Sequence, residues 1–180
     1  MKKALIVVDY QNDFVCGSLA NPFAAAIEEN ICHKIKQYRE SQADIIFTFD
    51  THNDNYLKTQ EGSMLPVPHC LNGTNGWQLY GQVAALLHDN DRCFVKGSFG
   101  SPELFDFLRT QNYQSIELIG VVSNICVISN AILAKTALPE VPIIVDASCT
   151  ASNDPQLHEK AMDVLESMQF QVINRTAKQE

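Results

Sequence analysis

The stretch ALIVVDYQNDF, residues 4–14, joins five apolar residues to a carboxylate at Asp9. An apolar run of this length is typical of a strand that is buried on both faces of a parallel sheet. Two lysines precede the run, as in a signal peptide, but its apolar part is too short for the hydrophobic segment of one. We therefore interpret residues 4–8 as a buried strand.

Further short apolar or β-branched runs follow, at intervals that leave room for a helix or a crossover. They are DIIFTF (44–49), RCFV (92–95), SIELIGV (115–121), PIIVD (142–146) and FQVI (170–173). Between 155 and 168, apolar residues recur at helical spacing behind two candidate caps, Asn153 and Asp154. This alternation predicts an α/β fold, a three-layer α/β/α sandwich with a mostly parallel sheet of about six strands. We expect a single domain over residues 1–180.

The composition narrows the class of partner. The chain has 180 residues, of which 46% are hydrophobic and 19% charged, and its formal net charge is −8. Because Lys and Arg do not cluster, we expect no nucleic-acid partner and no membrane partner, but a small molecule. We also expect a cytoplasmic location, where the six cysteines, none of them in a C-x-x-C pair, form no disulfides.

Polar and reactive side chains stand at the carboxyl ends of the predicted strands. Asp9 follows the first strand, Asp50 and His52 the second, Lys96 the third, and Cys126 lies in an apolar turn after the fourth. Ligands of open α/β sheets bind at this edge, near the point where the strand order reverses. A carboxylate, an ammonium and a thiol that meet there would form the activated nucleophile of a cysteine hydrolase. The alternative is that the cysteine is only a small core residue.

The segment between residues 50 and 79 has no clear hydrophobic period. It contains five residues that break regular structure, namely Gly62, Pro66, Pro68, Gly73 and Gly76. Compact domains seldom carry so long an irregular segment without a functional reason. We therefore predict that this segment contributes to the site.

Five blocks of sequence occur in the order in which the isochorismatase-like cysteine hydrolases have them. They are VVDYQNDF (7–14), FDTHND (49–54), PHCLNGTNG (68–76), FVKGSFG (94–100) and GVVSNICV (120–127). The chain thus resembles this family over roughly its whole length, and most of all its nicotinamidase/pyrazinamidase branch. The resemblance implies a catalytic triad of Asp9, Lys96 and Cys126. It also implies a divalent metal held by Asp50, His52 and His69, to which Glu61 could add a carboxylate.

The same resemblance implies how the site would act. The peptide between Val121 and Val122 would be cis and would turn backbone amides into an oxyanion hole, while Phe14 and Phe99 would pack beside a flat ring. Nicotinamide or pyrazinamide would be converted to the acid and ammonia through a thioester, a step of NAD salvage and pyridine nucleotide biosynthesis. One carboxylate and two imidazoles suit zinc, manganese or iron equally well. We expect a homo-oligomer.

The nucleophile would lie in the first turn of a helix that begins near Asn124, with Ser123 as its N-cap. Exposed amides at that position favour a thiolate. The family commonly has Thr-Asp or Thr-Glu before its cysteine, so this chain lacks one negative charge there. That departure bears on the substrate preference more than on the mechanism.

Other interpretations of these residues and of the function stay open from the sequence alone. Asp9 could cap a loop or helix, and His52 and His69 could be ordinary loop histidines. A related hydrolase acting on isochorismate, a carbamoyl amide or a ureido compound would keep the triad but need the metal less. A non-enzymatic descendant would be expected to have lost part of the triad, which is complete here. We expect structural roles for Cys16, Cys32, Cys93 and Cys149, solvent-facing positions for His33, His88 and His158, Trp77 at the site rim or in the core, and Cys70 as the weakest candidate ligand.

Overall fold

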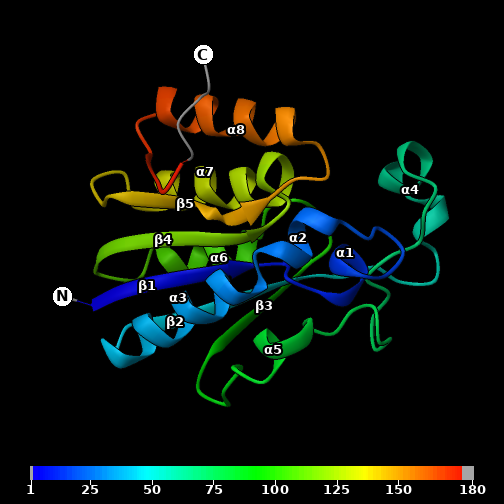
Figure 1. Ribbon diagram of the computed structural model, residues 1–180, viewed down its shortest axis with the longest axis horizontal. Helices are drawn as coiled ribbons and strands as arrows, with labels where there is room; N and C mark the ends of the chain where they lie inside the picture. The colour runs from blue at the N-terminus through cyan, green and yellow to red at the C-terminus, as the bar shows by residue number, and fades with distance from the viewer. Residues whose placement is uncertain (1, 176–180) are drawn as a thin grey trace.

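The protein, described by a computed structural model over residues 2–175, is built on one six-stranded sheet. The strand order is β3-β2-β1-β4-β5-β6, and every neighbouring pair is parallel (Figure 1). The strands are β1 (Lys2–Val8), β2 (Asp44–Asp50), β3 (Arg92–Lys96), β4 (Tyr113–Val121), β5 (Ile143–Ala151) and β6 (Gln171–Ile173). The predicted fold class is confirmed.

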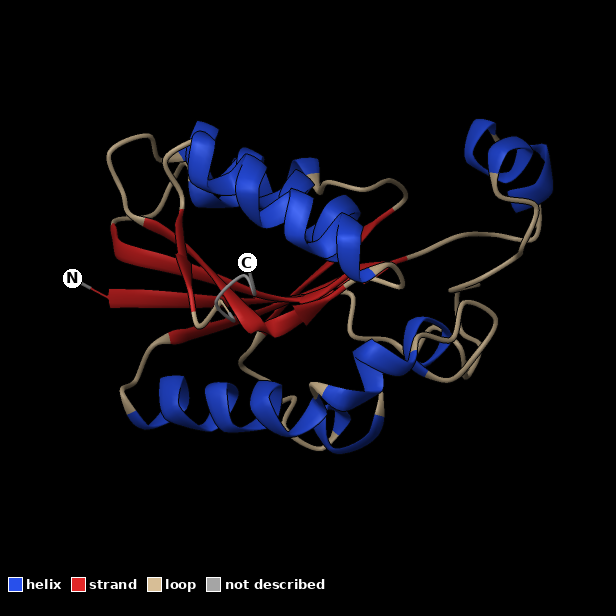
Figure 2. Ribbon diagram, turned by 45° about the horizontal axis from the view of Figure 1, so that its top comes forward, coloured by secondary structure: helices blue, strands red, loops and turns tan. Residues whose placement is uncertain are grey.

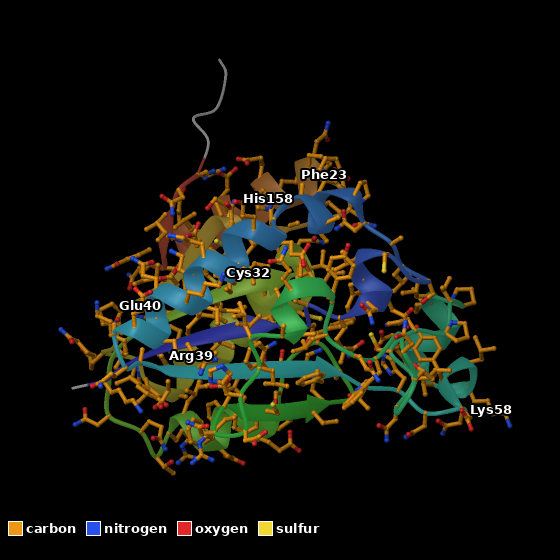
Figure 3. The ribbon with its side chains drawn as sticks, turned by 60° about the horizontal axis from the view of Figure 1, so that its bottom comes forward. Phe23, Cys32, Arg39, Glu40, Lys58 and His158 are labelled. Carbon is orange, nitrogen blue, oxygen red and sulfur yellow. The ribbon has the colours of Figure 1, made fainter. Side chains whose placement is uncertain are left out.

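Helices cover both faces of the sheet and form the outer layers of the sandwich (Figure 2). One face carries α6 (Pro102–Leu108), α7 (Ile128–Ala137) and α8 (Pro155–Ser167), and the other carries α1 (Asn12–Val15), α2 (Pro22–Ala26), α3 (Glu28–Glu40) and α5 (Gly81–Ala84). The 3₁₀ turn η1 (Tyr56–Lys58) and α4 (Gln60–Met64) project away from the sheet, with Lys58 at their outer edge (Figures 2 and 3). Among residues 2–175, no helix combines the length and apolar character that a membrane span requires.

Burial on both faces explains the apolar run that begins the chain. Leu5 and Val7 belong to the core cluster under α3, whereas Ile6 and Val8 belong to the cluster under α7 and α8. All four side chains are fully buried. Each is worth roughly 1.5–3 kcal/mol of burial free energy, so a strand with two apolar faces is stable only at the centre of the sheet.

The strand order reverses between β1 and β4, and this position creates the crevice in which such folds bind ligands. The two strands approach very closely at Gly120, whose φ is +110°. A Cβ atom at this position would lie 2.1 Å from the carbonyl oxygen of Val8. Glycine is therefore required for β4 to pair this closely with β1, one residue before the strand ends and leads into the Cys126 turn.

The structure confirms one predicted helix and extends one predicted strand. The helix predicted over 155–168 is α8, and the Asp154 carboxylate caps it by accepting the backbone N–H groups of Gln156 and Leu157. The strand predicted over 142–146 continues to Ala151. After a register shift, its second half pairs again with β4, so the polar residues that ended the apolar run did not end the strand.

A group of buried charges lies under α3, away from the crevice between β1 and β4. The ammonium of Lys34 contacts Glu117 at 2.8 Å and Asp146 at 2.7 Å. Burial works to raise the pKa of Asp146, but hydrogen bonds from Lys34, Ser148 and Asn174 outweigh it and lower that pKa. The unfolded chain therefore takes up this proton at a higher pH than the folded chain does. The stabilisation is present above the ordinary aspartate pKa and is lost as the pH falls through the folded value.

Asp146→Asn is thus expected to lower the free energy of unfolding at neutral pH by about 2 kcal/mol, the worth of a charged hydrogen bond. The difference from the wild type should begin to shrink below the ordinary aspartate pKa and disappear as the pH falls through the lowered pKa of the folded protein. Urea unfolding of both proteins at neutral pH and at a series of acidic pH values, down to the lowest at which both proteins fold, measures it. Asp54→Asn, at an exposed position, is the control. An Asp146→Asn deficit that stays constant with pH would contradict the assignment.

Candidate active site

Three side chains from three strand ends meet in the crevice. Asp9 follows β1, Lys96 ends β3, and Cys126 follows β4. The Lys96 ammonium lies 2.6 Å from Asp9 Oδ2 and 3.5 Å from the Cys126 sulfur. All three are buried, with exposed fractions of 0% for Asp9, 2% for Lys96 and 5% for Cys126. In this arrangement the Asp9 carboxylate can accept the thiol proton, and the Lys96 ammonium can stabilise the negative charge that forms. Because the three groups are shielded from water, these electrostatic interactions are stronger than those of a surface ion pair.

Burial controls the proton equilibria of these groups. Burial and the charge of Asp9 raise the pKa of the Cys126 thiol well above its ordinary value, although Lys96 acts in the opposite direction. Burial also raises the pKa of Asp9 against the opposing charge of Lys96. Both shifts favour the protonated forms of these two side chains, and Asp9 is the carboxylate placed to accept the thiol proton. These shifts give no support to the expectation of a thiolate favoured by a helix N-terminus, which stays a prediction.

The turn that carries the sulfur differs from the predicted helix start. It is a π turn, η2 (Ser123–Val127), in which the Val127 N–H reaches back to the Val122 carbonyl at 3.1 Å. Turns of this kind are frequent at functional sites. The prediction that Ser123 caps the helix is wrong, because its hydroxyl lies 3.0 Å from His158 Nδ1 instead. The peptide between Val121 and Val122 is cis.

A second cluster adjoins the first. Ligand atoms of Asp50, His52 and His69 all lie within 4.8 Å of one another, and the three residues are buried. Asp50 Oδ2 is 3.0 Å from His52 Nε2 and 3.3 Å from His69 Nε2. The other oxygen of Asp50 is 3.2 Å from the Lys96 ammonium. Lys96 therefore contacts a carboxylate of each cluster.

The chemistry of this donor set fits a divalent metal. His69 Nδ1 lies 2.8 Å from the Val67 carbonyl oxygen, so it carries the proton of the neutral ring and leaves Nε2 as an acceptor. That acceptor faces the carboxylate of Asp50, an arrangement that a cation between them would stabilise. Burial acts to raise the pKa of Asp50, but its close contacts with His52 and His69 and the charge of Lys96 outweigh burial and lower that pKa. An ionised carboxylate and two imidazoles are ligands of zinc, manganese or iron.

The irregular segment predicted between residues 50 and 79 closes this cluster. The His52 N–H donates to the Cys70 carbonyl at 3.0 Å, and the Asn72 N–H donates to the His52 carbonyl at 2.9 Å. The Asp13 carboxylate accepts the Cys70 N–H at 2.7 Å. These bonds return His69 to the side of His52. The Cys70 sulfur is not among the ligand atoms that lie within 4.8 Å of one another, so the structure gives no support to Cys70 as a ligand.

A cavity of about 530 Å³ connects the two clusters. Its wall contains Cys126, Asp50 and His69 together with Phe14 and Phe99, the two aromatic residues singled out from the sequence. Phe14 is buried, whereas Phe99 is 46% exposed and lies at the mouth. A lining of aromatic side chains with a few convergent polar groups is typical of a small-molecule site.

Glu61 belongs to the same cavity but stands farther out. It comes from α4 and lines the wall, and its Oε1 lies 3.7 Å from His52 Nε2 and 3.8 Å from His69 Nε2. Among lining residues that the sequence did not suggest, Asn21 is 2% exposed. Its Oδ1 caps α2, and its amide nitrogen has no hydrogen-bond partner.

Several residues lie away from the cavity. Trp77 packs on Phe49 with ring centroids 5.1 Å apart and is half-buried on the α5 side, so it is not at the rim. His158 was expected to face solvent, but it is half-buried and lines a groove with Phe23, next to it in Figure 3. His33 and His88 are exposed. The remaining cysteines lie outside the wall, Cys32 and Cys149 buried and Cys16 and Cys93 exposed.

Two residues that hold the site in place were missed by the sequence analysis. The Thr48 hydroxyl donates to Asp9 Oδ1 at 2.6 Å, and the Gln11 side-chain amide binds both backbone groups of Asp50, at 2.8 and 2.9 Å. Both residues are fully buried. A polar residue inside an apolar strand, as Thr48 is, was the available signal, because buried polar groups need partners.

Known proteins share this fold and sequence pattern. Residues 3–177 match the isochorismatase domain family. The structure of a nicotinamidase/pyrazinamidase from Bacillus subtilis is 30% identical, with a TM-score of 0.85 over 96% of this chain and 99% of that one. The nicotinamidase/pyrazinamidase of Mycobacterium tuberculosis is 28% identical over 84% of this chain and 89% of its own length. A pyrazinamidase from Pyrococcus horikoshii in complex with zinc shares the fold at 24% identity, with a TM-score of 0.84 over 97% and 100%. The chain belongs to the isochorismatase family of hydrolases.

Proposed function

We propose that this protein is a nicotinamidase, which hydrolyses nicotinamide, and also pyrazinamide, to the carboxylic acid and ammonia. The observation that carries the proposal is one cavity whose wall holds both the thiol of Cys126 and the cluster of Asp50 and His69. A nucleophile and a ring-binding group on the same wall suit a flat aromatic amide. The names of the 28% and 30% identical relatives support the same substrates.

In the proposed reaction, Asp9 accepts the proton of the Cys126 thiol as the sulfur attacks the carboxamide carbon. The carbonyl oxygen takes up negative charge, which the backbone amides of Val122 and Cys126 stabilise. Asp9 then returns the proton to the departing nitrogen, the C–N bond breaks, and ammonia leaves behind a thioester. Water, deprotonated by Asp9, cleaves the thioester to release the acid and restore the thiol. Lys96 keeps both negative charges stable in the buried site.

Asp50, His52 and His69 would hold a divalent metal, and Glu61 is the candidate for an additional carboxylate. When bound, that ion would supply a Lewis-acidic position for the ring nitrogen of the substrate. Phe14 and Phe99 would pack beside the ring and exclude water from it. The carboxamide is then oriented toward the sulfur.

The test is ammonia release from nicotinamide, pyrazinamide and benzamide. Benzamide has the same size but no ring nitrogen, so kcat/KM is expected to be roughly 100-fold lower for it, because an unpaired polar position in the site costs a few kcal/mol. Chelation of the metal, or His52→Ala, should lower kcat/KM for nicotinamide and reduce the ratio of this value to kcat/KM for benzamide. Metal content is measured on every sample.

His33→Ala is the matched control, because His33 is an exposed histidine of α3 that does not line the cavity. It should retain wild-type metal content and activity. Equal rates on nicotinamide and benzamide, or full nicotinamide turnover by protein shown to be metal-free, would refute the nicotinamidase proposal. Another small amide, a carbamoyl or ureido compound or isochorismate would then be the substrate to test.

A further inference from the structure

Asn130 is a fully buried polar residue that the proposed reaction does not use. It lies on α7, in the turn that follows Cys126. A buried side-chain amide must find partners for its donors and its acceptor, and those partners show what the residue holds together.

All three partners of Asn130 belong to segments that build the active site. Its Nδ2 donates to the carbonyl oxygen of Cys126 at 2.8 Å and to that of Phe99 at 3.0 Å. Its Oδ1 accepts the backbone N–H of Ser101 at 3.0 Å. The amide cannot be turned round, because its oxygen would then face two carbonyl oxygens. The side chain therefore joins the Cys126 turn to the loop over residues 97–101.

That loop follows Lys96 directly. The Lys96 ammonium donates to the Ser98 carbonyl at 3.0 Å, and Phe99 forms part of the cavity wall. The loop ends at Ser101, whose hydroxyl caps α6. One end of the loop is thus fixed by the sheet and the other by α6, while Asn130 fixes its middle against the nucleophile turn.

We infer that Asn130 is a positioning residue for the reaction, which sets the Lys96 ammonium and the Phe99 wall relative to the Cys126 sulfur. The inference rests on the proposed function for its substrate, but its geometry does not depend on which amide is cleaved. A displacement of about 1 Å at the reacting atoms is enough to cost on the order of 100-fold in rate.

Two substitutions test this role. Asn130→Asp keeps the shape and the acceptor for Ser101 but replaces the Nδ2 donor by oxygen. Asn130→Thr can donate back along the helix to the Cys126 carbonyl, as threonine hydroxyls do, but leaves the Phe99 carbonyl unpaired. Thr136→Ala is the control, since Thr136 lies exposed on the same helix and bonds only within it, to the Ile132 carbonyl.

The measurements are kcat and KM on nicotinamide, the rate of Cys126 alkylation by iodoacetamide, and the thermal midpoint. For Asn130→Asp we expect kcat to fall about 10- to 100-fold and alkylation to change severalfold in protein that is still folded at the assay temperature. Asn130→Thr should keep more of kcat than Asn130→Asp, with KM raised through Phe99. Thr136→Ala should match the wild type.

A lower thermal midpoint with unchanged kcat, KM and alkylation rate would overturn the inference and leave Asn130 a purely structural residue. If Asn130→Asp does not fold, Asn130→Thr decides the question by the same criteria. A wild-type protein that hydrolyses none of the amides would refute the nicotinamidase proposal alone. The alkylation rates of the variants would then decide on Asn130, because they need no substrate.

Discussion

Cys126→Ala is expected to abolish amide hydrolysis, with a fall in kcat of roughly 10⁴-fold or more, because no other side chain in the cavity wall can form the thioester. The fold should survive. Cysteine and alanine differ by one buried sulfur atom, and a loss of this size costs about 1 kcal/mol. The assay is ammonia release by protein whose folded state has been verified by circular dichroism.

The other cysteines provide the controls for this experiment. Cys32→Ala removes a buried thiol on the opposite side of the sheet and should keep full activity, as should Cys93→Ala. Iodoacetamide will also label the exposed Cys16 and Cys93, so inactivation is best followed in a variant that lacks both. Wild-type turnover by Cys126→Ala, or inactivation that follows the labelling of a different cysteine, would refute the nucleophile assignment.

The sequence predicted the layers of the fold because its strands are buried on both faces. A central strand such as β1 needs an apolar run, and that run is visible without any structure. The ends of the strands were less predictable. β5 extends past Asp146 through polar residues, since backbone pairing with β4 continues there, and no hydrophobic pattern records a register shift. The irregular segment between residues 50 and 79 was predicted to matter, but not the pairing of His52 with the chain around Cys70 that closes it.

The residues of the site could be named from the sequence, but their interactions could not. Lys96 was expected beside Asp9 and Cys126. Its 3.2 Å contact with Asp50, which links the triad to the candidate metal ligands, was not expected, because it depends on how far the lysine side chain extends. The prediction that Ser123 caps a helix was wrong for a related reason. A serine before a helix is usually a cap, but here a π turn begins at that residue and its hydroxyl meets His158 from α8.

One ammonium shared between two carboxylates makes the site sensitive to the loss of either. Lys96 is buried, and Asp9 and Asp50 are the carboxylates it contacts. Burial works to lower the pKa of Lys96, but the charges of Asp9 and Asp50 outweigh it and raise that pKa. Removing one partner of a buried pair commonly costs about 3–5 kcal/mol, because it leaves a charge without compensation. Substitutions of Asp9 must therefore be compared under conditions in which each protein is folded.

Asp9→Asn keeps the shape of the side chain but cannot accept the thiol proton, so kcat should fall on the order of 100-fold or more. Asp44→Asn is the matched control. Asp44 begins β2 at the amino end of the sheet, away from the crevice, and its substitution should leave kcat unchanged. Unchanged hydrolysis by Asp9→Asn would refute its role as the proton acceptor.

The same substitution should change the reactivity of the sulfur in the opposite direction. The negative charge of Asp9 raises the pKa of the Cys126 thiol, so its removal lowers that pKa and increases the thiolate fraction at a given pH. The pH midpoint for alkylation of Cys126 should therefore move down in Asp9→Asn, while hydrolysis falls. A disordered site would lose hydrolysis and give a thiol that titrates as an exposed cysteine does, whether or not Lys96 is present. Adding Lys96→Met to Asp9→Asn distinguishes the two cases, because loss of the ammonium should raise the midpoint again only in a folded site.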